Sequence, residues 1–363
     1  VQFVARLEEE RKIRTVGLAY PRDGAWWLEI RTAHTAGFYP LGESINLVDA
    51  IAKGAALART TIVHVEDLNG LPLHLVRSLT DRGLDVILSV HDFRLYCARP
   101  HLIEQATHRF CGYSTDMDRC ARCLKDVDMD VQRNQVDYRR VGADAVRNAR
   151  ALIYPSAFMQ RKFQELYPRR SAGQHEVVIA PAFSRSGDET PPLSDQPHIA
   201  FVGRIHHHSG AALIPQTMEL VLKRNPKAKA FVYGTGDADL MDEIQKVKRV
   251  KIQGYHRAGT LASLLTRDKI AVAVVPAIWP SAYGPVVDEC LAAGIPVVAF
   301  DVGAVGDRLG YWEVGRVVEM KHGHAGLTTA IFESLARAVK VPRGVITTIP
   351  SPARAAKRHS ELY

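Results

Sequence analysis

A short segment in the middle of the chain carries residue types that could bind a diphosphate. Gly203-Arg204 directly follows the apolar run of residues 198–202. A glycine at a strand end lets the backbone approach a ligand closely, and the free amides and dipole of a following helix favour an anion. The arginine would add a charge-assisted contact. We therefore expect Gly203 and Arg204 to bind phosphate groups, with a plain turn and a solvated arginine as the alternative.

A second segment could bind hydroxyl groups. Tyr283-Gly284-Pro285 leads into a predicted helix that contains Glu289 and stops at Gly294. A carboxylate in the first turns of that helix can accept two hydroxyl hydrogen bonds, as a ribose would offer. The alternative is that Glu289 only offsets the helix dipole.

Four of the five cysteines lie close together in the sequence, and Cys120-Ala-Arg-Cys123 has the spacing of a zinc knuckle. Cys97 and Cys111 could complete a tetrahedral thiolate set. In a reducing cytoplasm disulfides would not persist, which favours a metal over crosslinks. We predict a structural zinc ion that ties down a long polar loop. Free thiols and an iron–sulfur cluster are the alternatives, and no catalytic role is expected for this site.

The elements that must position these residues alternate between strands and helices. Short apolar runs rich in β-branched residues predict strands, and the amphipathic stretches between them predict helices. Such βαβ units favour a parallel sheet. The predicted strands are residues 61–65, 84–90, 151–154 and 177–180 in the first half, and residues 198–202, 229–233, 250–253, 270–275, 296–300 and 316–318 in the second.

The segment of residues 184–197 is polar, rich in proline and without periodicity, so we predict an exposed linker there. The fold class is then α/β, with two doubly wound, Rossmann-like domains and a ligand in the cleft between them. These domains are residues 1–183, with a Cys-rich insert at residues 94–124, and residues 198–363. Residues 1–60 contain no Gly-rich turn, so we expect that an initial strand and loop are missing from the first domain.

The composition is that of an ordinary globular protein and excludes several classes. With 363 residues and 47% hydrophobic residues, the chain can form two cores without disulfides, which excludes a disordered or collagen-like protein. No stretch approaches the length of a membrane span or resembles a signal peptide, so we expect a cytoplasmic location. The formal net charge of +8 favours an anionic ligand or an anionic membrane surface over nucleic acid, which we do not expect as a partner.

Five motifs, in their order and spacing, resemble those of family 4 glycosyltransferases, which have the GT-B fold. The resemblance covers most of residues 60–340. It implies transfer of a sugar from a nucleotide-diphosphate sugar with retention at the anomeric carbon. It also implies that Glu289 holds the ribose, Arg204 the diphosphate, and that His91 is a catalytic residue facing the donor sugar. The motifs are His91-Asp92, Tyr154-Pro155-Ser156-Ala-Phe158, Phe201-Val-Gly-Arg204, Tyr233-Gly-Thr-Gly236-Asp237, and Tyr283-Gly284 through Gly294-Ile-Pro-Val-Val.

The sequence departs from this family at two charged positions. Ser281 stands where the family has the first glutamate of its E-x7-E motif, and Ser209 stands in place of its phosphate-binding lysine. A serine can still bind a hydroxyl or a phosphate oxygen, but a neutral hydrogen bond contributes only about 1 kcal/mol against about 1.5 to 3 for a charged one. We expect a protonated His208 to offset the lost lysine. An exposed polar loop is the alternative.

We therefore expect a glycosyltransferase of polysaccharide or glycolipid assembly, with a glycan or lipid-linked acceptor and no metal for catalysis. Its donor site would include Tyr283 and Gly284. The alternative is a catalytically weak or inactive module that binds nucleotide sugars. A row of arginines on one helical stretch could also hold the protein at the inner membrane through anionic headgroups, a solvated face being the default. These are Arg139, Arg140, Arg147 and Arg150.

Overall fold

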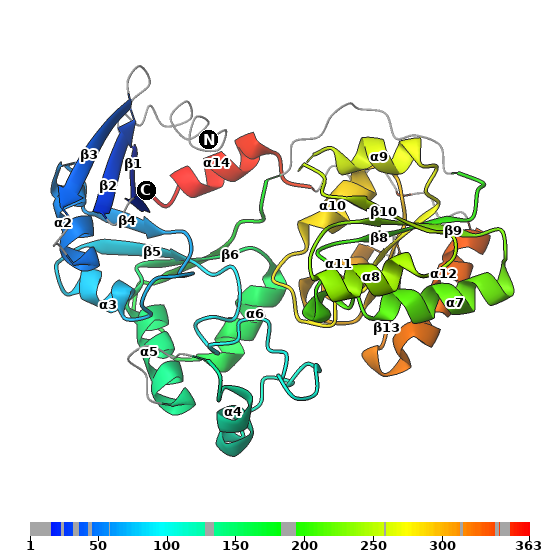
Figure 1. Cartoon of the computed structure of the whole chain (residues 1–363). Helices are drawn as coiled ribbons and strands as arrows, with labels where there is room; N and C mark the ends of the chain where they lie inside the picture. The colour runs from blue at the N-terminus through cyan, green and yellow to red at the C-terminus, as the bar shows by residue number, and fades with distance from the viewer. Residues whose placement is uncertain are drawn as a thin grey trace. The chain divides into compact units, whose positions relative to one another are not determined.

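The computed structural model forms two compact units. It describes residues 16–22, 25–31, 36–42, 46–57, 59–127, 134–182, 194–257, 259–312, 315–337, 341 and 349–363. The first unit comprises Val1–Pro100, Thr115–Ala182 and Ser351–Tyr363, and the second comprises His101–Ser114 and Phe183–Pro350 (Figure 1).

The first unit contains a four-stranded parallel sheet, in which the strands follow one another in chain order. All of β6 and the last four residues of β5 are buried. Strands buried on both faces appear in a sequence as continuous apolar runs, which is why the pattern of residue types locates them. The four strands predicted for the first half are confirmed to within about two residues. They are β4 (Ile62–Val65), β5 (Asp85–Ser89), β6 (Ala151–Tyr154) and β7 (His175–Val178).

Helices of the first unit begin where the sequence supplies capping groups. After β6, the Ser156 hydroxyl accepts a hydrogen bond of 3.2 Å from the Met159 amide and so caps the next helix. Asn134 caps another helix in the same way through the Asp137 amide. The helices are α2 (Leu47–Leu57), α3 (Leu75–Thr80), α4 (Met117–Cys123), α5 (Gln135–Asn148) and α6 (Ala157–Leu166).

An antiparallel sheet of three strands precedes the parallel one and has no counterpart in the predictions. Its strands are β1 (Val16–Arg22), β2 (Ala25–Arg31) and β3 (Ala36–Gly42), paired in chain order. The pattern of residues gave little signal here, because two prolines and three glycines interrupt the runs of strand-forming residues.

The second unit is built on a six-stranded parallel sheet with the order β10-β9-β8-β11-β12-β13. In chain order this is 3-2-1-4-5-6, the order of a doubly wound Rossmann-like domain. All six predicted strands are confirmed, two of them without any shift. The strands are β8 (His198–Val202), β9 (Lys229–Tyr233), β10 (Val250–Gly254), β11 (Val272–Val275), β12 (Val297–Phe300) and β13 (Gly315–Val318).

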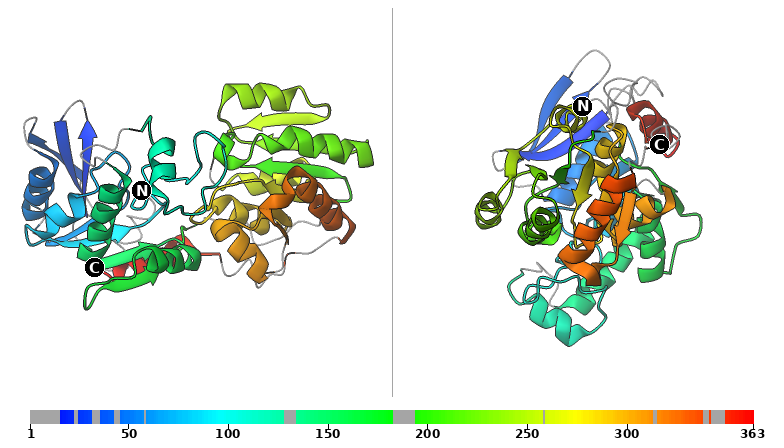
Figure 2. Two further views of the ribbon diagram at one scale, coloured as in Figure 1. Left: turned by 90° about the horizontal axis from the view of Figure 1, so that it is seen from below. Right: turned by 90° about the vertical axis from the view of Figure 1, so that its right-hand side faces the viewer.

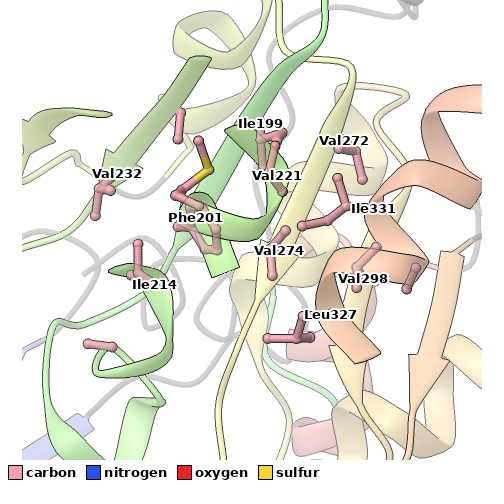
Figure 3. Packing of buried hydrophobic residues seen from close by; sticks show 14 of the residues in the cluster. Ile199, Phe201, Ile214, Val221, Val232, Val272, Val274, Val298, Leu327 and Ile331 are labelled. Atoms are coloured by element: carbon pink, nitrogen blue, oxygen red, sulfur yellow. The ribbon is translucent and has the colours of Figure 1, made fainter. Parts of the chain in front are cut away.

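Two apolar clusters cover the two faces of this sheet, since successive side chains of a strand point to opposite faces. Ile199 and Phe201 of β8 face one cluster, together with residues of α7 and α12 (Figure 3). Ala200 and Val202 face the other, with residues of α9, α10 and α11. Helices therefore flank the sheet on both sides (Figures 1 and 2). The helices are α7 (Leu213–Arg224), α8 (Ala238–Gln245), α9 (Leu261–Arg267), α10 (Pro285–Ala292), α11 (Gly303–Trp312) and α12 (Gly323–Arg337).

Two segments group with a different unit from the one their place in the sequence suggests. The last helix, α14 (Pro352–Ser360), packs Ala355 against Ile87 and Ile153 of the first unit. The predicted second domain of residues 198–363 is therefore too long at its carboxyl end. The segment His101–Ser114, part of the predicted Cys-rich insert, groups with the second unit, where Phe110 packs against the core.

The predicted linker of residues 184–197 lies mostly outside the described residues, so its place as the domain boundary stays a prediction. Among the helices that the structure describes, none combines the length and apolarity that crossing a bilayer would need.

Candidate functional site

The sheet of the second unit reverses its strand order between β8 and β11. Doubly wound sheets bind ligands at this point, outside the carboxyl ends of the strands. Gly203 follows β8 and Pro276 follows β11, and together with Arg204 and Ser209 they line a pocket there. The structure thus brings three of the predicted donor-binding residues together in one place.

Backbone segments approach one another so closely at this pocket that only glycine fits. A Cβ atom on Gly234 would lie 1.8 Å from the Gly203 carbonyl oxygen, and one on Gly210 would lie 1.8 Å from the Pro276 carbonyl oxygen. The φ angles of Gly203, Gly210 and Gly234 are +138°, +71° and +155°, values that other residues rarely adopt. The close packing holds the turns after β8, β9 and β11 against each other.

The histidine loop lies beside this pocket. The His206 Nδ1 atom is 2.8 Å from an Asp237 carboxylate oxygen. The His208 ring stacks on His101 with 3.9 Å between ring centroids, and Trp279 meets His101 edge-on. The Ile278 amide donates to the His208 carbonyl oxygen at 3.2 Å, which joins the two loops of the pocket.

Burial, with a smaller contribution from the neighbouring histidines, lowers the pKa of His208 to about 4. This imidazole is therefore neutral near pH 7. The expectation that an adjacent diphosphate keeps His208 protonated, and so offsets the family's missing lysine, stays a prediction. Arg204, which is exposed and has no ion-pair partner among the described residues, is the cation of this loop.

The helix α10 begins at a turn with a defined geometry. Gly284 has a φ of +72° and is followed by Pro285, a residue favoured at the first position of a helix. A Cβ atom on Gly284 would lie 2.4 Å from a Val305 methyl group. The predicted Tyr283-Gly284 turn is thus a tight entry to the helix that carries Glu289.

A buried ion pair holds this turn, and the sequence did not reveal it. Asp288 has a side-chain exposure of 1% and pairs with Arg308 of α11. The Tyr283 hydroxyl donates to Asp288 at 2.6 Å, and Arg308 donates to the Tyr283 carbonyl oxygen at 2.9 Å. A charged residue among the apolar residues of α10 was the available signal, because a buried carboxylate requires a partner.

Glu289 is buried and accepts a hydrogen bond of 3.1 Å from the Gly259 amide. Burial raises the pKa of Glu289. Backbone hydrogen bonds from Gly259 and Leu261 oppose this rise and tie the carboxylate to the start of α9. The role of Glu289 toward a ribose stays a prediction.

Ser281 lies in the same turn. Its backbone carbonyl accepts from the Ala304 amide at 2.9 Å, whereas its hydroxyl is buried and has no hydrogen-bond partner in the described structure. Buried hydroxyl groups nearly always have a partner, so this one is a candidate contact for a bound ligand.

His91 belongs to the first unit, directly beyond β5. Its Nε2 atom lies 3.5 Å from a Glu66 carboxylate oxygen. The hydrogen bond with Glu66 raises the pKa of His91 although burial opposes it. His64, by contrast, is bonded through both ring nitrogens, as expected for a polar residue with satisfied partners.

The sequence of the domain that contains this pocket also matches a known family. Residues 196–337, which contain the whole six-stranded sheet, match the family model described as Glycosyl transferases group 1. We call residues 196–337 the glycosyltransferase domain after this match. The predicted enzyme class is confirmed for this domain. Comparison with curated protein sequences gives no match.

The similarity to solved structures extends beyond the glycosyltransferase domain to most of the chain. Sucrose-phosphate synthase from Thermosynechococcus elongatus is 18% identical, with a TM-score of 0.61 and coverage of 87% of this chain and 76% of that protein. Anabaena HepE in complex with UDP is 13% identical, with a TM-score of 0.62 and coverage of 89% and 83%. The pneumococcal O-GlcNAc transferase GtfA in complex with UDP and GlcNAc is 11% identical, with a TM-score of 0.60 and coverage of 95% and 69%. At such identities the likeness concerns the fold, and the predicted GT-B class with two Rossmann-like domains is confirmed.

A larger cavity of the glycosyltransferase domain lies away from these residues. It is lined by Gln196, Arg224 and Phe332 and by residues that precede β8, β11 and β12. It thus opens at the amino ends of the strands, and no predicted site residue lines it.

The four clustered cysteines lie outside the glycosyltransferase domain model and are all free thiols. Cys120 is buried and accepts a contact of 3.7 Å from Arg139. Cys111 groups with the second unit and the other three with the first. No three His, Cys, Asp or Glu side chains of the described residues come together in a way that could hold a metal ion. The structural zinc ion stays a prediction that metal analysis can test.

Proposed function

We propose that this chain transfers a sugar from a nucleotide-diphosphate sugar to a glycan or lipid-linked acceptor, with retention at the anomeric carbon. The observation that carries the proposal is the pocket at the strand-order reversal of the glycosyltransferase domain. It combines close backbone packing around Gly203 with an exposed Arg204. Backbone amides and one guanidinium group are suited to a diphosphate.

The proposed roles follow from the contacts of each side chain. Arg204 stabilises the leaving diphosphate, and the Glu289 carboxylate accepts from the ribose. The unpartnered Ser281 hydroxyl and Ser209 contact the donor as neutral hydrogen-bonding groups. His91 of the first unit supports the reaction as a second cation. We expect no metal requirement, because charged side chains and amides stabilise the diphosphate.

The solved neighbours support a nucleotide sugar as donor. HepE has been crystallised with UDP and with UDP-glucose, and GtfA with UDP and GlcNAc. A uridine diphosphate sugar is therefore the first donor to test. Retention rests on the resemblance of the sequence motifs to family 4 enzymes.

The predicted membrane contact through the arginines of α5 gains no support from their surroundings. Arg140 pairs with Asp137 at 3.7 Å, and Arg147 pairs with Asp144. Arg150, just beyond the helix, lies 3.6 Å from Asp85. Arginines with acidic partners have less charge to offer to lipid headgroups.

A second candidate function is a nucleotide-sugar-binding module with little or no catalysis. It is favoured by Ser281 and Ser209, which remove one negative and one positive charge from the family's site, and by the neutral state of His208.

Thermal unfolding with UDP-, GDP-, dTDP- and ADP-sugars, followed by assay of the released nucleoside diphosphate, separates these two functions. A ligand at 100 times its Kd stabilises the native state by about 2.7 kcal/mol, which corresponds to roughly 5 to 10 °C. A thermal shift together with donor consumption supports the transferase. A shift without consumption supports the binding module, and no shift with any donor contradicts both.

Glu289→Gln and Arg204→Ala test the assigned roles. Removing the Arg204 guanidinium should weaken diphosphate binding about 10- to 100-fold, the worth of a charged hydrogen bond. Glu289→Gln keeps an acceptor for the Gly259 amide, so the protein should stay folded while most turnover is lost. The matched control is Glu219→Gln, an exposed residue of α7. Unchanged turnover in Glu289→Gln would refute its assignment.

A further inference from the structure

The carboxyl ends of β4 and β5 bring an acid and a histidine together. These strands are parallel neighbours (Figure 1), so their following residues meet at one edge of the sheet. Glu66 follows β4, and its Oε2 atom lies 3.5 Å from the His91 Nε2 atom. Glu66 has no role in the function proposed above.

A second imidazole, His64, faces the other oxygen of the same carboxylate. Its Nδ1 atom is 3.6 Å from Glu66 Oε1. However, His64 is already bonded to the Tyr363 hydroxyl at 2.6 Å and to the Ser89 hydroxyl at 2.9 Å. Burial lowers the pKa of His64 to about 4, so this ring is neutral near pH 7. His64 therefore leaves the negative charge of Glu66 uncompensated.

His91 is in the opposite situation. Its side chain is 47% exposed, and that of Glu66 is 55% exposed. Burial works against ionisation of Glu66, yet the hydrogen bond with His91 lowers the pKa of Glu66 to about 2. The other charged groups around His91 are Asp67 and Asp92, whose fields also favour its protonated form. The buried His359 of α14 faces the same carboxylate and has a lowered pKa, caused mainly by burial.

We propose that Glu66 is a positioning residue that holds His91 as an imidazolium with Nε2–H directed at the carboxylate, which leaves Nδ1–H for a negatively charged group of a ligand bound at this edge of the sheet. The inference rests on the proposed function for the role of His91 in the reaction. No proton is transferred in this role, because the imidazolium stabilises a negative charge by a hydrogen bond. Glu66 acts on the reaction only through His91.

The pairing is tested by histidine NMR titration of the full chain, without any donor. The chain has 15 histidines, and the resonance that disappears in His91→Gln assigns His91. An exposed ion pair contributes about 0.2 to 1 kcal/mol, so Glu66→Gln should lower the midpoint of His91 by roughly 0.2 to 0.7 pH units. The matched control is Asp67→Asn, which removes the same charge one residue away and should shift the midpoint less. An unchanged midpoint in Glu66→Gln, or an equal shift in Asp67→Asn, overturns the pairing.

The effect on the reaction is tested by the pH dependence of donor consumption. The imidazolium is lost as pH rises through its midpoint, so kcat should fall on the alkaline side in the wild type. Glu66→Gln should move this fall to lower pH by the amount measured by NMR and lower kcat more than it raises KM, since the imidazolium acts on charge that develops during the reaction. A shifted midpoint with an unchanged pH profile overturns the positioning role. A wild-type protein that consumes no donor refutes the proposed function, while the NMR titration still decides the pairing.

Discussion

The ion pair of Asp288 and Arg308 is the contact on which the start of α10 depends, and Arg308→Met removes one partner of it. The side chains are 1% and 10% exposed, so the substitution leaves a carboxylate buried without its cation. Breaking a buried pair in this way costs about 3 to 5 kcal/mol. For a domain of this size each kcal/mol shifts the midpoint of thermal unfolding by about 2 to 4 °C. We expect Arg308→Met to lower the Tm by roughly 6 to 20 °C.

The matched control is Arg316→Met in the same domain. Arg316 pairs with Glu333, whose side chain is 54% exposed, at 3.2 Å. Such a pair contributes at most about 1 kcal/mol, or less than roughly 4 °C. The two substitutions remove the same group, so the difference between them isolates the effect of burial.

The stability of Arg308→Met should depend on pH in a direction that the buried carboxylate determines. Burial already raises the pKa of Asp288, although Arg308 and Tyr283 oppose the shift. Without Arg308 this pKa rises further, so the folded state of the variant binds a proton that the unfolded chain has lost. Stability then falls as pH rises through this range. Calorimetry at pH 4.5 and 7.5 should find the smaller deficit at pH 4.5, and Asp288→Asn added to Arg308→Met should recover much of the loss. A deficit equal to that of Arg316→Met, or one that does not shrink at low pH, would refute this account.

Two further predictions concern the phosphate pocket and the cysteines. Gly234→Ala places a methyl group 1.8 Å from the Gly203 carbonyl oxygen and should abolish the thermal shift caused by nucleoside diphosphates. The control is Gly310→Ala, where nothing lies within 4 Å of the added methyl group, and it should leave the thermal shift intact. Elemental analysis of protein purified without chelators should find about one zinc ion per chain. The double substitution Cys120→Ser and Cys123→Ser should remove this ion. A wild-type protein without metal contradicts the zinc hypothesis and supports free thiols.

The parallel strands could be predicted because burial on both faces makes their sequences continuously apolar. In β11 and β12 every residue is buried, and such runs differ clearly from the surrounding amphipathic helices. The strands β1 to β3 gave no comparable signal. They form an antiparallel sheet, and prolines and glycines interrupt their runs of strand-forming residues.

The grouping of distant segments could not be predicted from local patterns. The carboxyl-terminal helix α14 contains only alanines as apolar residues, yet it buries Ala355 and Ala356 and brings Tyr363 to His64. The segment His101–Ser114 follows strands of the first unit but packs its aromatic rings on the second. Contacts between segments that are far apart in the chain depend on the three-dimensional fold, so composition and periodicity do not predict them.

Parts of the candidate site could be predicted because they depend on local sequence patterns. Glycines at strand ends leave a clear mark in the sequence, and Gly203 with Arg204 and Ser209 does line one pocket. The pair of Asp288 and Arg308 left only a faint mark, because the two residues lie on different helices. The protonation of His208 beside a diphosphate stays a prediction, and no local pattern reveals the burial among other rings that lowers its pKa.

The backbone of the pocket bears on whether the site can act with Ser281 and Ser209 in place of the two charged residues of family 4 enzymes. The close approach at the pocket is made by backbone atoms of Gly203, Gly210 and Gly234, and replacing a lysine by Ser209 does not change it. At Ser209 the loss is then the difference between a charged and a neutral hydrogen bond, about 0.5 to 2 kcal/mol, or roughly 2- to 30-fold in affinity. A loss of that size weakens donor binding without abolishing it. The arrangement of the backbone therefore favours a working transferase over an inactive module.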